Sequence, residues 1–129
     1  MSCPRCESPV VAFAVPPALR EHAPAAKTAI CTRCLRTAPV ADANPEAAVA
    51  DDPDFAAVDP AFPAGDAGVA LALLCGCLDS FALRRESIEA LVAHAERAGT
   101  DVFAFLDRLD ASTAAFDLER RRAALMDLL

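Results

Sequence analysis

Apolar side chains recur at helical spacing throughout residues 67–129. Residues 67–79 are apolar on almost every side, which predicts a helix that other elements surround. Three further helices are expected, each with its own start or stop signal: residues 86–98 before Gly99, a segment opened by Thr100 or Asp101, and a segment capped by Asp117. The short connections predict a compact antiparallel bundle of about four short helices around the first one.

Several positions within these helices carry expectations of their own. Asp66 is expected to cap the first helix, and Gly76 to let a neighbouring helix approach closely. Cys75 and Cys77 are expected in the core, because side chains two residues apart on a helix point about 200° apart and do not easily share a metal. On the last helix Leu118, Leu125, Met126 and Leu129 are expected to face inward, and Arg120, Arg121 and Arg122 largely outward.

The first forty residues favour strands instead of helices. Runs at 10–15, 27–30 and 35–40 predict three short strands in an antiparallel sheet, with one helical turn at 18–23. Four apolar side chains of this part are expected to form the apolar cover on the metal that the cysteines hold: Phe13, Val15, Ile30 and Leu35. A piece of this size needs a metal or disulfides, because it buries too little apolar surface to be stable alone.

Between these two parts lies a segment rich in proline and aspartate. Residues 41–66 contain four prolines and seven acidic groups with no basic one, which predicts a mostly irregular acidic linker. Phe55, Val58 and Phe62 recur at spacings of three and four, so a short turn of this linker is expected to dock onto the helices. The predicted organisation is therefore residues 1–40, a linker at 41–66, and a helical domain at 67–129, in a small α+β fold.

Two Cys-x-x-Cys pairs carry the chemistry of the chain. Cys3 and Cys6 form the first pair, Cys31 and Cys34 the second, and 24 residues separate the pairs. Such pairs place four thiolates on two turns and complete a tetrahedron around one structural Zn²⁺, with no open coordination position. Iron in the same four-sulfur site is the nearest metal alternative. A thiol–disulfide exchange site fits less well, because neither pair precedes a helical pattern.

Neighbouring residues qualify this zinc-ribbon interpretation. Glycine commonly follows the second cysteine of such turns, where the backbone is left-handed, but here Glu7 and Leu35 stand in those places. His22 is expected to be a surface residue, because four cysteines already fill the metal shell, and His94 is expected to be solvated.

Charge is distributed unevenly along the chain. The net charge is −7, yet residues 1–40 carry five basic and two acidic groups, whereas residues 67–129 carry seven arginines and ten acids. An acidic surface disfavours nucleic acid, and the absence of Trp and Tyr removes good platforms for base stacking. The longest apolar run is about half of the roughly 20 residues that span a bilayer. Neither a signal peptide nor a membrane segment is expected, and the six cysteines favour metal in a reducing, cytoplasmic compartment.

The Cys-Pro-Arg-Cys and Cys-Thr-Arg-Cys turns at residues 3–6 and 31–34, on an acidic and lysine-poor background, resemble the small Cys-Pro-x-Cys zinc-finger proteins of halophilic archaea. Together with the helical tail, they are similar to an uncharacterised haloarchaeal family with a zinc ribbon. The resemblance implies zinc at the four cysteines and regulatory roles through protein or nucleic-acid contacts.

No Ser/His/Asp or Cys/His grouping has a spacing that supports catalysis, and no glycine-rich phosphate loop is present. The sequence therefore predicts a non-enzymatic zinc-ribbon adaptor that binds a protein partner or pairs with itself through the helical domain. The alternative is nucleic-acid binding through the ribbon, with four basic residues meeting phosphates: Arg5, Lys27, Arg33 and Arg36. A thiol redox protein is the third and least favoured hypothesis.

Overall fold

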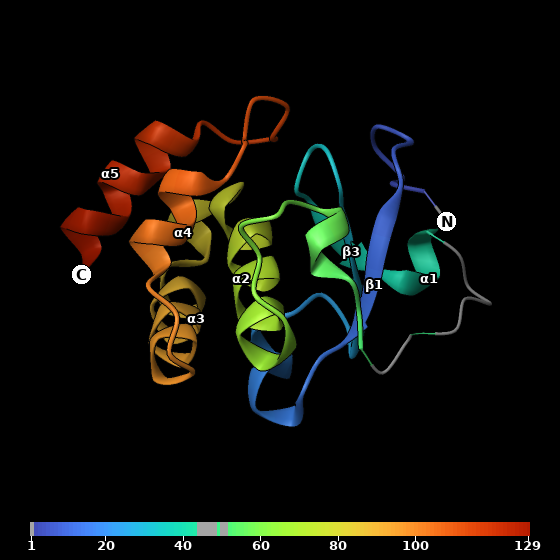
Figure 1. The fold of residues 1–129 in the computed structure, drawn as a ribbon, viewed down its shortest axis with the longest axis horizontal. Coiled ribbons are helices and arrows are strands. Elements are labelled where there is room, and N and C mark those ends of the chain that lie inside the picture. Colours follow the sequence, from blue (N-terminus) through green and yellow to red (C-terminus); the bar gives the residue numbers. More distant parts are fainter. Residues whose placement is uncertain (1, 44–48, 50–51) are drawn as a thin grey trace.

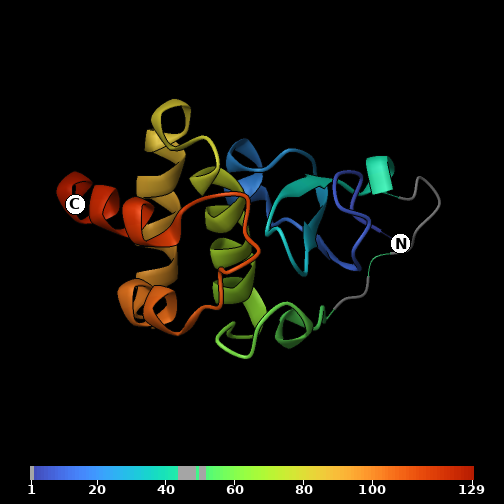
Figure 2. The ribbon, with the colours of Figure 1, turned by 90° about the horizontal axis from the view of Figure 1, so that it is seen from above.

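The computed structural model describes residues 2–43, 49 and 52–129 of the chain. A small antiparallel sheet lies at one end of the molecule, α2 runs along the middle, and α3, α4 and α5 form the opposite end (Figure 1). Seen from above, α2 separates the sheet from the other helices (Figure 2). The α+β fold class with an N-terminal four-cysteine cluster is confirmed.

The sheet contains β1 (Val10–Ala14), β2 (Lys27–Cys31) and β3 (Thr37–Pro39), in the order β1-β2-β3 with both pairs antiparallel. A 3₁₀ turn, η1 (Pro17–His22), connects the first two strands where a helical turn was expected. The third strand begins two residues later than predicted. Residues 35 and 36 still belong to the second cysteine turn. A hydrogen bond of 2.9 Å, donated by the Cys31 N–H to the Arg36 carbonyl, closes this turn.

The sheet packs one face on helix α2 (Gly65–Leu78), which is buried along almost its whole length. Phe13 and Ile30 point into this contact and are fully buried. Gly76 does admit a close neighbour, but that neighbour is β3 and not a helix. A Cβ added at Gly76 would lie 2.8 Å from Cγ2 of Thr37, so only glycine leaves room for the strand.

The start of α2 differs from the prediction. The helix begins at Gly65 with Ala64 as its N-cap residue, so the assignment of Asp66 as the cap is wrong. Gly65 has a φ of 69°, a conformation that glycine adopts without strain, and it turns the chain into the helix one residue before Asp66. Asp66 is left in the first turn, where its carboxylate still interacts favourably with the helix dipole.

The described part of the acidic segment docks as its phenylalanines predict. Phe55, in the 3₁₀ turn η2 (Phe55–Ala57), and Phe62 are both buried. The Phe55 ring centroid lies 5.3 Å from that of Phe13, and the Phe62 centroid 4.9 Å from that of Phe105 on α4. A short helix, α1 (Val40–Ala43), follows β3. The linker prediction for residues 44–48, 50 and 51 falls outside the described residues.

The remaining elements are η3 (Phe81–Leu83), α3 (Arg85–Arg97), α4 (Val102–Arg108) and α5 (Leu118–Leu128). Asp101 and Asp117 cap α4 and α5 as expected, each carboxylate accepting a backbone N–H three residues on. One cluster of buried apolar residues extends through the sheet, the η2 segment and the helices. The division at residues 40 and 66 stays a prediction about chain organisation. Among the described residues, no helix has both the length and the apolarity to cross a membrane.

The prediction of which α5 residues face inward is wrong for two of them. Only Leu125 is fully buried, while Met126 and Leu129 are more than half exposed. Arg121 and Arg122, expected largely outward, fold back over the rings of Phe81 and Phe103. The helix lies at the end of the molecule and packs on one side only, so it has a narrow apolar stripe and its arginine stems cover neighbouring apolar surface.

Candidate metal centre

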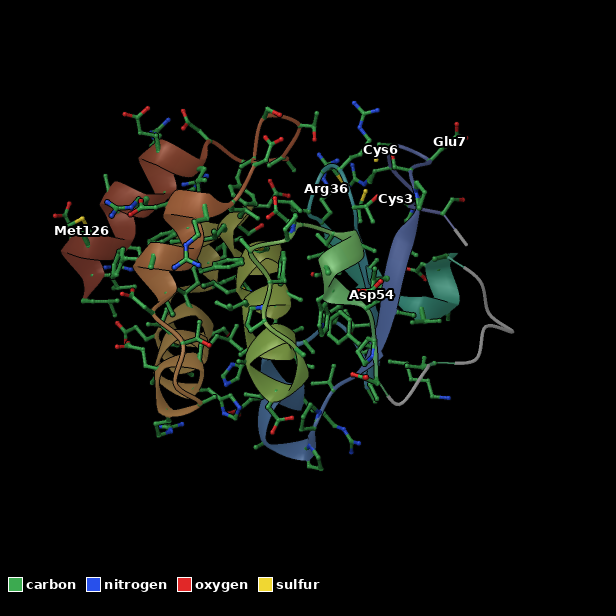
Figure 3. The ribbon with its side chains drawn as sticks, in the orientation of Figure 1. Cys3, Cys6, Glu7, Arg36, Asp54 and Met126 are labelled. Atoms are coloured by element: carbon green, nitrogen blue, oxygen red, sulfur yellow. The ribbon has the colours of Figure 1, made fainter. Side chains whose placement is uncertain are left out.

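The four N-terminal cysteines meet at one end of the sheet. Their Sγ atoms all lie within 4.8 Å of one another. The Cys3 and Cys34 sulfurs are 3.8 Å apart, and those of Cys6 and Cys31 are 3.3 Å apart. Strand register brings the two turns together, because Val10 at the start of β1 pairs with Cys31 at the end of β2. Figure 3 shows Cys3 and Cys6 at this end of the sheet, with Arg36 near them.

The two cysteine turns share two internal hydrogen bonds. In each turn the first cysteine donates its N–H to the carbonyl five residues on, and its sulfur accepts the N–H two residues on. The equivalent bonds are Cys3 to Ser8 (2.8 Å) and Cys31 to Arg36 (2.9 Å), and Arg5 to Cys3 Sγ and Arg33 to Cys31 Sγ (3.4 Å each). This repeated geometry aims four sulfurs at one point, and the N–H···S bonds disperse negative charge on the sulfurs.

Glu7 and Leu35 occupy the left-handed position of each turn, with φ of 64° and 61°. These are the places where glycine is common. The absence of glycine therefore does not prevent the turn, although the conformation costs about 1–2 kcal/mol for a residue with a side chain.

The pKa of Cys6 is shifted in the opposite direction from those of Cys31 and Cys34. Burial raises the pKa of Cys31 to about 12 and raises the pKa of Cys34 as well. Cys6 is exposed, and hydrogen bonds from the Ser8 backbone and hydroxyl, followed by one from Cys31, lower its pKa to about 6. A cation entering the cluster must therefore displace protons from Cys31 and Cys34, whereas Cys6 already supplies a thiolate near pH 7.

The donor set fits a metal ion bound by four sulfurs. A tetrahedral Zn–S bond of about 2.3 Å places sulfurs about 3.8 Å apart, which is close to the spacing observed here. All six cysteines are free thiols. The cluster can therefore hold a metal ion.

The loop between α4 and α5 supports the second cysteine turn, which the sequence did not indicate. The Thr113 hydroxyl donates to the Arg33 carbonyl at 2.8 Å, and the Ala115 N–H donates to the Cys34 carbonyl at the same distance. Ala115 also packs against the buried cysteines, as does Val10. The candidate metal centre is thus joined to the helices through a segment about 80 residues away in sequence. The apolar cover expected on the metal is wrong, because its four members belong to the core shared with α2: Phe13, Val15, Ile30 and Leu35.

Asp59 fixes the other end of this loop. Its carboxylate is only 8% exposed and accepts the N–H of Asp110 at 3.0 Å and that of Ala61 at 2.8 Å. The Asp-Pro dipeptide at residues 59 and 60 is the one sequence signal that could have marked this residue, since Asp-Pro favours turns.

The other two cysteines and the two histidines of the chain are not part of the four-cysteine cluster. Cys75 and Cys77 are buried in the core on α2, as predicted. The assignment of His22 to the surface is wrong, because its side chain is 11% exposed and its Nδ1 lies 2.9 Å from the Ser87 hydroxyl on α3. His94 is half-buried, not solvated. His22 joins η1 to α3 and contributes nothing to the metal shell.

The four basic residues proposed to meet phosphates do not form one patch. Arg5 and Arg36 line the same cavity beside the cysteines, and Arg33 lines a second hollow with Thr113. Lys27 begins β2, at the opposite end of the strand from Cys31. Three of the four residues therefore gather near the metal centre and the fourth lies apart.

Comparisons with known proteins give a family but no described function. Neither a curated protein nor a solved structure matches the chain. One family matches nearly all of it, residues 2–129, and is described as a family of unknown function, DUF6276. The chain belongs to the DUF6276 family.

Proposed function

We propose that the four cysteines hold one structural Zn²⁺ and that the protein is a non-enzymatic interaction protein. One observation carries the metal proposal: four sulfurs on two equivalent turns lie within 4.8 Å of one another. Four thiolates fill a tetrahedral shell and leave no position for substrate, so the ion would stabilise the fold and perform no chemistry. The resemblance to haloarchaeal zinc-finger proteins, which implies zinc at the four cysteines, is part of this proposal.

A protein partner is favoured over nucleic acid on electrostatic grounds. The net charge is −7, and only Arg5, Arg33 and Arg36 of the proposed phosphate contacts lie near one another. Phosphate binding gains its free energy by counterion release from many contacts, which three arginines on an acidic protein supply poorly. We propose a cytoplasmic location, because free thiols and zinc thiolates persist in a reducing compartment.

Metal analysis of the purified chain tests the first part. One zinc per chain is expected, with Cys31→Ser losing it and Cys77→Ala retaining it, because Cys77 is a buried cysteine outside the cluster. A visible absorption spectrum with one iron per chain would identify the metal as iron. A metal-free protein whose four thiols titrate freely would overturn the zinc proposal in favour of a redox role.

Gel retardation separates the two kinds of partner. The zinc-loaded protein is expected to leave duplex DNA and single-stranded RNA unshifted at low and physiological salt. A shift that Arg5→Gln and Arg33→Gln weaken, while Lys27→Gln does not, would instead assign nucleic-acid binding to the cysteine end of the sheet.

A further inference from the structure

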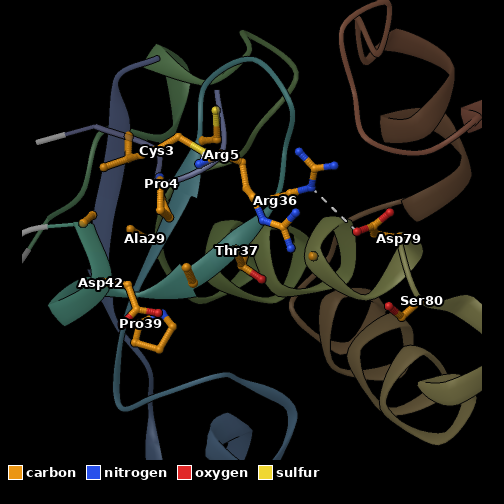
Figure 4. A pocket seen from close by; sticks show the side chains of 15 residues that line it. Cys3, Pro4, Arg5, Ala29, Arg36, Thr37, Pro39, Asp42, Asp79 and Ser80 are labelled. Carbon is orange, nitrogen blue, oxygen red and sulfur yellow. Dashed lines mark hydrogen bonds and ion pairs between the residues drawn. The ribbon is translucent and has the colours of Figure 1, made fainter. Parts of the chain in front are cut away.

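The free edge of β3 borders a cavity beside the candidate metal centre. The strand order makes β3 an edge strand. A cavity of about 480 Å³ lies between the first cysteine turn, β3, α1 and the C-terminal end of α2 (Figure 4). Four consecutive residues, from 36 to 39, contribute to its lining. The cavity therefore follows the strand along its length.

The register of the sheet leaves backbone groups of β3 directed toward this edge. Cys31 donates its N–H to Arg36, and bonded and non-bonded pairs alternate along antiparallel strands. Ala38 is therefore bonded to Ala29, while the N–H and C=O of Thr37 point away from β2. Pro39 occupies the next such position, which suits it because a missing N–H costs least on a free edge. Because α1 begins at Val40, the Pro39 carbonyl accepts the first N–H of that helix. Thr37 thus offers one donor and one acceptor to another strand.

The two ends of the cavity carry opposite charges. Arg5 and Arg36 lie at the cysteine end, and Asp42 lies beside Pro39 at the other (Figure 4). Arg36 Nε is 3.8 Å from Asp79 Oδ2, which orients the guanidinium but is too long for a hydrogen bond. Arg5 forms no ion pair with any described residue. Both guanidinium groups therefore have N–H donors free to bind a carboxylate. The two oxygens of a carboxylate can pair with two N–H groups of one planar guanidinium.

The floor of the cavity is apolar. Val10, Ala29 and Ala38 line it, and all three lie on the face of the sheet away from α2. Ala38 is the member of this set on β3 itself, so its small side chain leaves room for a residue of a strand laid against the edge, whereas Ala29 and Val10 lie one and two strands further in.

We propose that the β3 edge is the docking site for an extended internal segment of a partner protein, with an acidic side chain at the end near Arg5 and Arg36. The segment pairs with the backbone of Thr37, places a small apolar side chain beside Ala38, and has no acidic residue at the end near Asp42. This inference rests on the proposed role as an interaction protein and specifies the partner's chemistry. Backbone pairing supplies affinity, and the charged ends set the direction of the segment.

Selection from a display library of random heptapeptides, with both peptide ends fused to carrier, tests the site. Zinc-loaded wild-type protein is the bait. The enriched peptides are expected to carry β-branched residues and one acidic residue toward one end. Their affinity should fall at least tenfold in Arg5→Gln and in Arg36→Gln. Arg33→Gln is the matched control, because Arg33 has the same place in its cysteine turn as Arg5 but lines another hollow. Amide NMR shifts should centre on Thr37 and Ala38.

Three results would overturn the inference: no enrichment, peptides that bind the Arg5→Gln and Arg36→Gln variants as tightly as wild type, or NMR shifts away from β3. A wild-type dimer that Arg36→Gln dissociates would show that a second copy occupies the edge, and would overturn it too. Metal content and the NMR spectrum of each bait are measured on the same sample. A folded, zinc-loaded bait that selects no peptide refutes only the docking site, whereas a metal-free wild type refutes the proposed zinc centre.

Discussion

Glu7 and Leu35 have the same backbone conformation in two equivalent turns but opposite surroundings. Both have positive φ, 64° and 61°, one residue after the second cysteine of each pair. Glu7 is exposed and directed away from the sheet (Figure 3), whereas Leu35 is 2% exposed and belongs to the main apolar core. Burial of the Leu35 side chain therefore offsets the backbone strain in the second turn. The exposed Glu7 side chain gains no comparable burial in the first.

Replacing these two residues by glycine should therefore change stability in opposite directions. Glu7→Gly relieves about 1–2 kcal/mol of left-handed strain and loses about 0.4–1 kcal/mol through the entropy of the unfolded chain, so a net gain of about 0.5 kcal/mol is expected. Leu35→Gly should lower the free energy of unfolding by about 2–4 kcal/mol, because it removes a buried leucine. Urea denaturation at fixed free zinc measures both. Glu7→Ala, which keeps the Cβ, is the control and should show no gain; an equal gain in Glu7→Ala would contradict the strain argument.

The hydrogen bond from Thr113 to the Arg33 carbonyl should stabilise the metal centre from outside its coordination shell. Thr113→Ala is expected to lower the free energy of unfolding by about 1 kcal/mol and to speed transfer of the metal to a chelator, because the second cysteine turn loses a restraint. Thr113→Ser keeps the hydroxyl and should transfer the metal as slowly as wild type. Ser112→Ala, one residue away, is a second control. Unchanged transfer rates in Thr113→Ala would show that the loop does not restrain the turn.

The contact between Gly76 and Thr37 should couple α2 to the sheet. Gly76→Ala places a Cβ against the Thr37 side chain, and overpacking of this kind costs about 1–3 kcal/mol. The better helix propensity of alanine returns only about 1 kcal/mol, so a net loss of stability is expected. Thr37→Ala removes the two side-chain atoms nearest to the new Cβ. The double variant should therefore lose less than the two single losses combined, in a double-mutant cycle by urea denaturation; strict additivity would contradict the contact.

Alkaline pH should destabilise the core through Cys75. Burial raises the pKa of this thiol from 9.0 to about 12, so the folded protein retains a proton that the unfolded chain releases. The stability that the buried, neutral Cys75 thiol contributes is fully present below pH 9. The free energy of unfolding then falls as the pH rises toward 12, at about 1.4 kcal/mol per pH unit. Between pH 9 and 10.5 wild type should therefore lose about 2 kcal/mol more than Cys75→Ala, as followed by urea denaturation. Parallel losses in the two proteins would show that Cys75 does not titrate with unfolding.

The sequence by itself determined the local features. The two cysteine pairs, the three short strands, the caps Asp101 and Asp117 and the burial of α2 were all predictable, because each depends on neighbouring residues or on apolar periodicity. The family of the chain is shown by comparison, while the metal's identity and the partner remain proposals.

Only the tertiary structure decided which distant segments meet. It placed β3 against Gly76, Thr113 and Ala115 on the second cysteine turn, and Asp59 on the loop before α5. It also exposed Met126 at the end of the molecule, where the prediction had it inward. Periodicity reports how a segment repeats along its own axis, but the partner of each face depends on chain packing in three dimensions, which spacing does not encode.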